Sequence, residues 1–241
     1  FFFLFNPTIN SSFFLFGFAL MFGTSFKGLI GTDGWLLLKY VRLDHEARIY
    51  TFWFFQVVFC GASATIVSGG VAERMRFFGY MLISFIISTF IYPVFGHWAW
   101  GGNYDLAPAQ GWLAALGYKD FAGSSVVHMV GGITTLACLL VLGPRKGRYN
   151  PDGTSNKIWG CDIPMSTLGV FLLWFGWFGF NGGSTLAANK DIARIIINTN
   201  LAACTGALSC LSLTWMRQRN LDVGSIINGS SLTFSFHSVK E

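Results

Sequence analysis

A histidine within an apolar segment is the residue of this sequence that points most directly to chemistry. His128 follows an Asp120-Phe-Ala-Gly segment, in which the aspartate can cap a helix by accepting from the backbone N–H three residues on. Eight residues at about 1.5 Å each would place His128 about 12 Å beyond that helix start, near the middle of a membrane core about 30 Å thick. Such a histidine either lines a pathway or bonds to a neighbouring carbonyl in the core, and both interpretations stay open. For Asp120, capping alone is a sufficient role.

Aromatic side chains form a second candidate site. Trp98 and Trp100, with His97, end one of the apolar runs. Aromatic rings at that position usually belong to the interface between lipid and water. A tryptophan face also attracts cations, so Trp100 at the mouth of a pore could select a small cation from water.

Phe180 and Ser184 stand four residues apart in another apolar run, and therefore lie on one face of a helix. A ring there could close a narrow passage, while the hydroxyl could accept from an N–H donor. Apolar bulk facing lipid is the simpler interpretation of the same spacing.

Composition shows which kind of element must position these residues. The chain is 53% hydrophobic and only 11% charged, with a mean hydropathy of +0.53, whereas an ordinary soluble domain carries about 25% charged residues. Its net charge of +5 comes from short loops and forms no basic stripe, so nucleic acid is not an expected partner. No metal-ligand cluster, phosphate loop or hydrolase elbow is visible in the sequence. We therefore expect no metal, no cofactor and no enzymatic activity.

Six apolar stretches are candidates for spanning helices, and the first is the weakest because polar residues interrupt it. They cover residues 13–23, lengthened by 1–5, and then 50–71, 77–98, 121–142, 164–188 and 192–216. The connections between them are too short to form soluble domains. The sequence thus predicts an all-α fold, a polytopic bundle of transmembrane helices, in which residues 1–241 form one membrane domain.

Four ordered motifs in this chain resemble those of the ammonium transporter family. They are Phe55-Gln56 to Phe59 with Val71-Ala-Glu-Arg-Met-Arg76, then Trp98-Ala-Trp100-Gly-Gly, then Asp120-Phe-Ala-Gly-Ser-Ser-Val-Val-His128 with Gly143-Pro-Arg-Lys-Gly-Arg148, and Gly176-Trp-Phe-Gly-Phe-Asn-Gly-Gly-Ser184. The resemblance extends over residues 12–229, nearly the whole chain.

The resemblance implies a role for each candidate residue. Trp100, Phe59 and Ser184 match the extracellular site that recruits ammonium, while Phe59 and Phe180 match the rings that gate the pore. His128 matches the first of two pore histidines. Asp120 matches the carboxylate that supports the vestibule.

The resemblance also implies an architecture. Family members are homotrimers with one pore in each subunit, built from about eleven helices in two inverted halves. This chain resembles helices two to seven, so we expect it to stop before the second half of the inverted repeat is complete. The second pore histidine has no counterpart here, because His237 lies in a polar tail, 233–241, that does not continue a spanning pattern.

The expected function is transport of ammonium or ammonia across a membrane, with recruitment of the cation at an aromatic site and deprotonation before passage. The protein would be an integral, multi-pass membrane protein, surrounded by lipid and placed in the plasma membrane. A sensor that does not transport, or an inactive truncated remnant, is the alternative. A hydrolase using Ser125 or Ser184 with His128 is disfavoured, because no oxyanion site is visible and Ser125 lies on the neighbouring turn of the same helix.

Overall fold

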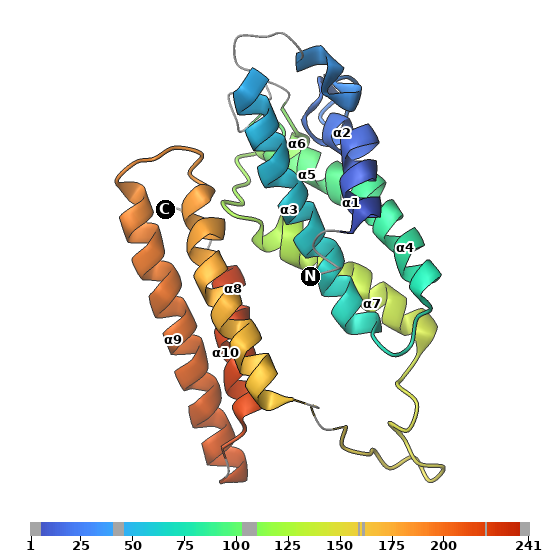
Figure 1. Cartoon of the computed structure of the whole chain (residues 1–241), viewed down its shortest axis with the longest axis vertical. Helices are drawn as coiled ribbons and strands as arrows, with labels where there is room; N and C mark the ends of the chain where they lie inside the picture. Colours follow the sequence, from blue (N-terminus) through green and yellow to red (C-terminus); the bar gives the residue numbers. More distant parts are fainter. Residues whose placement is uncertain are drawn as a thin grey trace. The chain divides into compact units, whose positions relative to one another are not determined.

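A computed structural model describes residues 6–40, 46–102, 110–158, 160, 162–219 and 221–236, and most of them are helical (Figure 1). The contacts divide the chain into two compact units. The first comprises Phe1–Asp120 and Ser125–Tyr149, and the second comprises Phe121–Ser124 and Asn150–Glu241. The expectation of a single membrane domain stays a prediction.

Among its described residues, the first unit has four helical runs. The first is α1 (Pro7–Ser12), η1 (Phe13–Gly17) and α2 (Phe18–Phe22), and the second is α3 (Glu46–Val71). The third is α4 (Phe77–Ile86), η3 (Ile87–Ile91) and α5 (Tyr92–Trp100), and the fourth is η4 (Ser124–Met129), which enters the unit at Ser125, with α7 (Val130–Leu142). Shorter elements connect these runs: β1 (Ser25–Phe26), β2 (Ile30–Gly31), the 3₁₀ turns η2 (Trp35–Tyr40) and the helix α6 (Trp112–Ala115).

Length and hydropathy confirm the predicted spans. Among the described residues, five helices are long and apolar enough to cross a membrane: Ala47–Val71, Phe77–Trp100, Ser124–Leu142, Ile163–Gly183 and Asp191–Gln218. The expected first stretch is a shorter apolar helix, Pro7–Phe22, and its extension over residues 1–5 lies outside the described residues.

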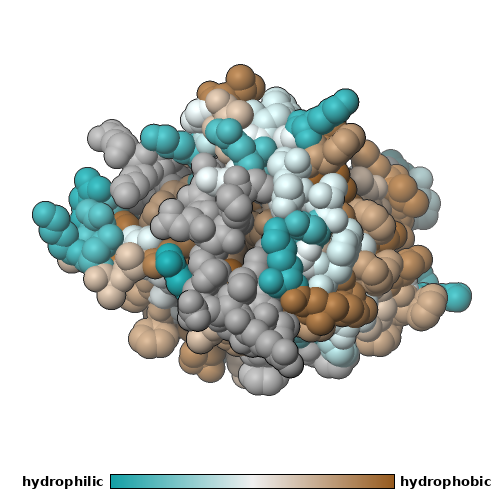
Figure 2. Space-filling model, turned by 90° about the horizontal axis from the view of Figure 1, so that it is seen from above, coloured by the Kyte–Doolittle hydropathy of each residue, from teal (hydrophilic) through white to brown (hydrophobic). Residues whose placement is uncertain are grey.

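Large apolar side chains are exposed along these helices, as expected where lipid is the solvent. Val141 is 87% exposed, Phe78 80% and Leu140 79%. Figure 2 shows many brown apolar side chains at the surface of the face drawn, among teal hydrophilic ones. An exposed apolar surface of this kind would make a water-soluble protein aggregate.

Small residues let α3 and α7 pack closely within the first unit. A Cβ at Gly131 would lie 2.8 Å from the Ser63 carbonyl oxygen, so only glycine allows this approach. At the far end of the same helix pair, the Arg74 guanidinium donates to the Gly143 carbonyl at 2.9 Å. The helix that carries His128 is thereby held against α3 at both places.

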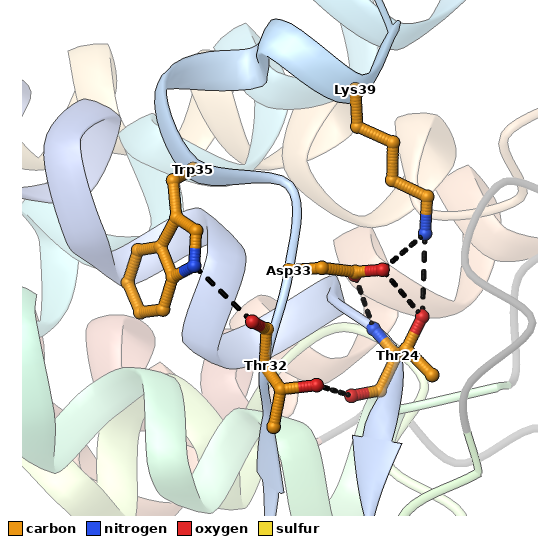
Figure 3. A network of polar contacts seen from close by, with 5 residues as sticks. All are labelled: Thr24, Thr32, Asp33, Trp35 and Lys39. Carbon is orange, nitrogen blue, oxygen red and sulfur yellow. Dashed lines mark hydrogen bonds and ion pairs between the residues drawn. The ribbon is translucent and has the colours of Figure 1, made fainter.

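A polar network closes the short hairpin that precedes α3 (Figure 3). Asp33 accepts from the Thr24 backbone N–H at 2.7 Å, from the Thr24 hydroxyl at 2.7 Å and from the Lys39 amine at 2.7 Å. Trp35 donates its indole N–H to the Thr32 carbonyl at 3.2 Å. Burial alone would raise the pKa of Asp33, but the bonds from Lys39 and Thr24 outweigh it and lower the pKa to about 2.

The described residues of the second unit form the helices α8 (Ile163–Gly183), α9 (Asp191–Gln218) and α10 (Val223–Phe236). Asp162 caps α8 by accepting from the Met165 N–H at 2.8 Å. Inside the unit, the Asn181 amide donates to the Thr199 hydroxyl at 3.0 Å, so this buried polar pair is satisfied.

Helix α10 includes residues 233–236 of the polar tail that the sequence analysis placed at 233–241, and it is not among the described helices long and apolar enough to cross a membrane. The helix continues to Phe236, and its contact with α9 is close at Gly229, where a Cβ would lie 2.6 Å from the Gly206 carbonyl oxygen. Packing against α9 allows a helix that hydropathy alone does not reveal. His237 lies outside the described residues.

Candidate functional site

Asp120 is the acceptor that organises the start of the helix bearing His128. One of its carboxylate oxygens, Oδ2, accepts from the Ser125 N–H at 2.9 Å, the Val126 N–H at 2.9 Å and the Ser125 hydroxyl at 2.6 Å. Amide donors at a helix N-terminus favour a negative charge at this position. The carboxylate and the helix start therefore stabilise one another.

The sequence predicted that Asp120 accepts from the N–H three residues on, and that bond stays a prediction. The carboxylate accepts from the N–H groups five and six residues on. In the turn before these residues, Gly123 has a φ of 99° that disfavours any other residue, and the helix begins at Ser124. The cap exists, but a turn is inserted before the helix.

The same turn changes the expected distance of His128 from the helix start. His128 is the fifth residue of η4, a π-helical stretch, and thus lies about 6 Å along the axis from Ser124 rather than about 12 Å. Its side chain is half-buried. The role of His128 as a pore histidine stays a prediction.

Trp100 lies beside Asp120 at the end of α5. Its indole N–H donates to the Asp120 carbonyl oxygen at 2.6 Å, and its ring lies 6.1 Å from that of Phe59 at an interplanar angle of 68°. Trp100 is 1% exposed and Phe59 2%. A ring at the lipid surface would be exposed, so burial disfavours the belt interpretation for Trp100.

Phe59 in turn packs on Phe55, with ring centroids 4.5 Å apart. The first unit therefore gathers three of the predicted site residues: Phe59 from α3, Trp100 from α5 and Asp120 ahead of η4. Aromatic rings beside a carboxylate can attract a small cation.

Phe180 and Ser184 belong to the second unit. The Ser184 hydroxyl, at the end of α8, donates to the Phe180 carbonyl at 2.8 Å, which confirms that the two residues stand on adjacent turns. The Phe180 ring stacks on Trp177, with centroids 5.0 Å apart and planes 17° from parallel. That Ser184 joins the recruitment site and Phe180 the gate stays a prediction.

Two further residues of the first unit were not recognised from sequence. Tyr118 donates its hydroxyl to the Ser125 hydroxyl at 2.7 Å, and so joins the Asp120 cluster. His97, expected at the lipid interface, is instead fully buried: its Nδ1 donates to the Met21 carbonyl at 2.8 Å and its Nε2 pairs with the Ser25 hydroxyl at 2.8 Å. Nothing in the spacing of Tyr118 signals its contact, apart from its place two residues before the aspartate.

The cluster does not have the arrangement of a serine hydrolase. The Ser125 hydroxyl is bonded to Asp120 rather than aligned by His128. Within the part of the chain that the structure describes, no three His, Cys, Asp or Glu side chains gather in a way that could hold a metal ion.

Comparison with known proteins connects this geometry to one family. The model of the Ammonium Transporter Family matches residues 8–231. Among curated proteins, the chain is 44% identical to ammonium transporter Amt2 of Archaeoglobus fulgidus over 230 residues, or 91% of this chain and 47% of that protein. It is 36% identical to ammonium transporter 1 member 2 of Arabidopsis thaliana, covering 90% of this chain and 46% of that protein.

Solved structures share the fold. A structure described as a sensor Amt protein matches with a TM-score of 0.91 and 41% identity, covering 96% of this chain and 57% of that one. A point mutant of Candida albicans Mep2 matches with a TM-score of 0.83 and 30% identity, covering 95% of this chain and 50% of that one. The chain spans about half the length of the relatives that it matches.

Proposed function

Because this chain belongs to the ammonium transporter family, we propose that it forms the part of an ammonium-conducting pore that recruits the cation and leads it to the first pore histidine. The observation that carries the proposal is the cluster of Phe59, Trp100 and Asp120 at the start of the helix bearing His128. The curated relatives are described as ammonium transporters, in agreement with this function.

Recruitment rests on the aromatic rings. The face of a tryptophan attracts a cation with about 0.5–2 kcal/mol, depending on how far the pair is withdrawn from water. The negative charge of Asp120, whose backbone carbonyl accepts from the Trp100 indole, adds to this attraction. Ser184 would supply a hydroxyl acceptor and Phe180 the second ring of the gate, as the family motif implies.

Passage requires deprotonation. Ammonium would pay a large solvation cost if it crossed an apolar pore as an ion, whereas ammonia is small and neutral. The Phe59 ring next to Trp100, which also packs on Phe55, would exclude the ion, and the imidazole of His128 offers ammonia a hydrogen-bond partner beyond it. The complete protein would be a homotrimer embedded in lipid, in the plasma membrane of a cell that takes up nitrogen.

A sensor that binds ammonium is the second candidate function. It is favoured by the match to a sensor Amt protein, which has the higher TM-score and identity of the two structures described above. The same cluster of rings would then bind the cation. The protein would respond to bound ammonium and would not carry it across the membrane.

Uptake measurements separate the two functions. The complete protein that contains this chain would be expressed in cells that lack ammonium transporters. The purified protein would also be reconstituted in liposomes. A transporter restores growth on low ammonium and takes up labelled methylammonium. A sensor shows thermal stabilisation by ammonium chloride relative to sodium chloride without uptake, and a folded protein with neither property would overturn both proposals.

A further inference from the structure

Gln56 is a glutamine of α3 whose side chain is buried without a hydrogen-bond partner among the described residues. It is 0% exposed, and neither its amide nitrogen Nε2 nor its amide oxygen Oε1 is bonded there. Asn6, Ser84 and Thr89 each leave a single buried side-chain atom unbonded in the same part of the chain. At Gln56 both ends of the amide are in this state, and folded proteins rarely leave a buried amide so.

Hydroxyl side chains of the first unit bond within their own helices. The Thr65 hydroxyl donates to the Gly61 carbonyl at 2.7 Å, because a short side chain reaches the carbonyl four residues earlier. The longer side chain of Gln56 makes no such bond. Ser63, two turns further along the same face of α3, is also 0% exposed, and its hydroxyl has no partner among the described residues. The buried face of α3 thus carries two polar side chains that the described residues do not satisfy.

Gln56 lies beside the rings of the candidate site. It follows Phe55 in sequence and precedes Phe59 by three residues, so its side chain and the Phe59 ring lie on the same side of α3. The Phe59 ring lies 6.1 Å from that of Trp100 and 4.5 Å from that of Phe55. The amide of Gln56 is therefore a polar neighbour of an aromatic cluster.

Contacts between α3 and α7 give the depth of Gln56 in the unit. The Gly131 backbone packs against the Ser63 carbonyl, and the Arg74 guanidinium donates to the Gly143 carbonyl. The two helices therefore run in the same direction with a nearly constant offset along the chain. The same offset brings Gln56 level with the first turn of η4, the start of the helix that bears the predicted pore histidine.

The groups of the amide define its ligand. Nε2 carries two N–H donors and Oε1 is an acceptor, so one small molecule satisfies both ends only if it both accepts and donates. Water and ammonia have this property. Ammonium has donors alone and would leave Nε2 unbonded, and its charge would lose hydration beside a side chain that carries no charge. The amide thus favours a neutral molecule over the ion.

We propose that Gln56 binds one small neutral molecule that both donates and accepts hydrogen bonds, which is water when ammonium is absent and ammonia during transport. Buried waters in proteins satisfy polar groups of this kind, with about three hydrogen bonds each. For ammonia, Gln56 would be a hydrogen-bond partner beside the Phe59 ring, in addition to His128. The assignment of ammonia rests on the function proposed above, whereas the assignment of water does not.

The first test detects the bound molecule without measuring transport. The side-chain amide signals of Gln56 are identified by nuclear magnetic resonance in the complete, isotope-labelled protein in liposomes, through their loss in Gln56→Met. In ammonium-free buffer we expect magnetisation transfer from water to the Nε2 protons. Ammonium chloride at alkaline pH, compared with the same concentration of sodium chloride, should then shift these signals as ammonia replaces water.

Each result of this test decides one assignment. Absence of transfer from water in ammonium-free buffer would overturn the binding site. Transfer from water without a shift on addition of ammonium would overturn the assignment of ammonia. If the complete protein transports nothing but the transfer from water is found, the proposed transport function fails while the site at Gln56 stands.

The second test measures methylammonium uptake by Gln56→Met in the complete protein, which removes the amide and keeps an unbranched side chain. We expect the maximal rate to fall about 2–12-fold, as for the loss of one neutral hydrogen bond. The half-saturating concentration should be unchanged, because the cation is recruited at Trp100. Gln56→Asn, which keeps an amide on a shorter side chain, should retain more of the rate. An unchanged rate in Gln56→Met would overturn the assignment of ammonia.

Thermal unfolding in detergent separates binding from a role in folding. No described residue bonds to the amide, so Gln56→Met should melt at a temperature no lower than the wild type. Thr65→Val is the matched control for uptake and melting, since Thr65 lies two and a half turns from Gln56, on the opposite face of α3. A lower melting temperature of Gln56→Met, together with a lower rate in both variants, would show that the amide serves the fold and would overturn the proposal.

Discussion

Two aspartates of the first unit each accept hydrogen bonds from a backbone amide and a hydroxyl, but their surroundings differ. Asp120 receives two backbone amides of a helix and a buried hydroxyl. Asp33 receives an amide, a hydroxyl and an amine in a hairpin where its side chain is 40% exposed and that of Lys39 is 44% exposed. One carboxylate fixes the start of a spanning helix, and the other closes a surface loop.

The comparison suggests where each charge matters: Asp120 bonds to the backbone donors of a spanning helix, whereas Asp33 bonds within an exposed loop. An exposed ion pair such as that of Asp33 with Lys39 is weakened by solvent and salt, and contributes little to stability. Asp120 is half-buried, and its loss would take an acceptor from two backbone donors at a helix start and from the buried Ser125 hydroxyl. Changes at the two sites should therefore differ strongly in effect.

The largest effect is expected for Asp120→Ala. It removes the acceptor of two amides and a hydroxyl, with an expected loss of about 2–4 kcal/mol in stability and loss of uptake. Thermal unfolding in detergent, followed by size-exclusion chromatography with fluorescence detection, measures the first, and methylammonium uptake measures the second. Asp120→Asn keeps an acceptor without the charge, so its loss of stability should be intermediate. If Asp120→Ala melted at the same temperature as the wild type, the cap would not contribute to stability.

His128→Ala should abolish or alter conduction and leave folding intact, because it leaves both aspartates in place and takes a polar group out of an apolar helix. Uptake in liposomes and the melting temperature are compared in one preparation. Normal conduction with unchanged selectivity would remove His128 from the pore and leave Asp120 as a purely structural residue.

Trp100→Leu should weaken binding of ammonium by about 0.5–2 kcal/mol through loss of the aromatic face. Trp100→Phe separates the two properties of the side chain, since it keeps a ring and removes the N–H that donates to Asp120. The concentration dependence of methylammonium uptake gives the apparent affinity. If Trp100→Phe binds methylammonium as weakly as Trp100→Leu does, the hydrogen bond to Asp120 rather than the ring accounts for the lost affinity.

The smallest effect is expected for Asp33→Asn, which should speed hydrogen exchange at the Thr24 and Thr32 amides without changing uptake. Asp152→Asn is a suitable control, because Asp152 makes a similar bond to the Thr154 N–H in another loop. If the Thr24 and Thr32 amides still exchange slowly in Asp33→Asn, the remaining hydrogen bonds of the hairpin are sufficient to keep it closed.

Asp33 also predicts a pH dependence with a defined sign. Its pKa falls on folding from 3.8 to about 2. The ionised carboxylate therefore stabilises the folded state fully well above pH 3.8, and this stabilisation is lost as the pH falls from 3.8 to about 2. The fluorescence of Trp35, isolated by subtracting the spectrum of Trp35→Phe, should change in this range. The same change in Asp33→Asn would assign it to another group.

Some features follow from local composition alone and were predicted from the sequence. The spanning helices appear as long apolar runs, because each must present apolar side chains to lipid over its whole length. The capping role of Asp120 and the adjacent turns of Phe180 and Ser184 depend on residues close in sequence. The motifs around Trp100 and His128 sufficed to indicate the family, which the comparisons confirm.

Other features were decided only by the tertiary structure. The contact of Trp100 with Asp120 joins residues 20 positions apart, and that of His97 with Met21 joins residues 76 apart. The turn at Gly123 moved the helix start, and packing against α9 stabilised α10 beyond what its composition suggests. The physical reason is that hydropathy records the solvent each segment prefers, whereas hydrogen bonds between segments depend on backbone angles and on side-chain directions that folding sets.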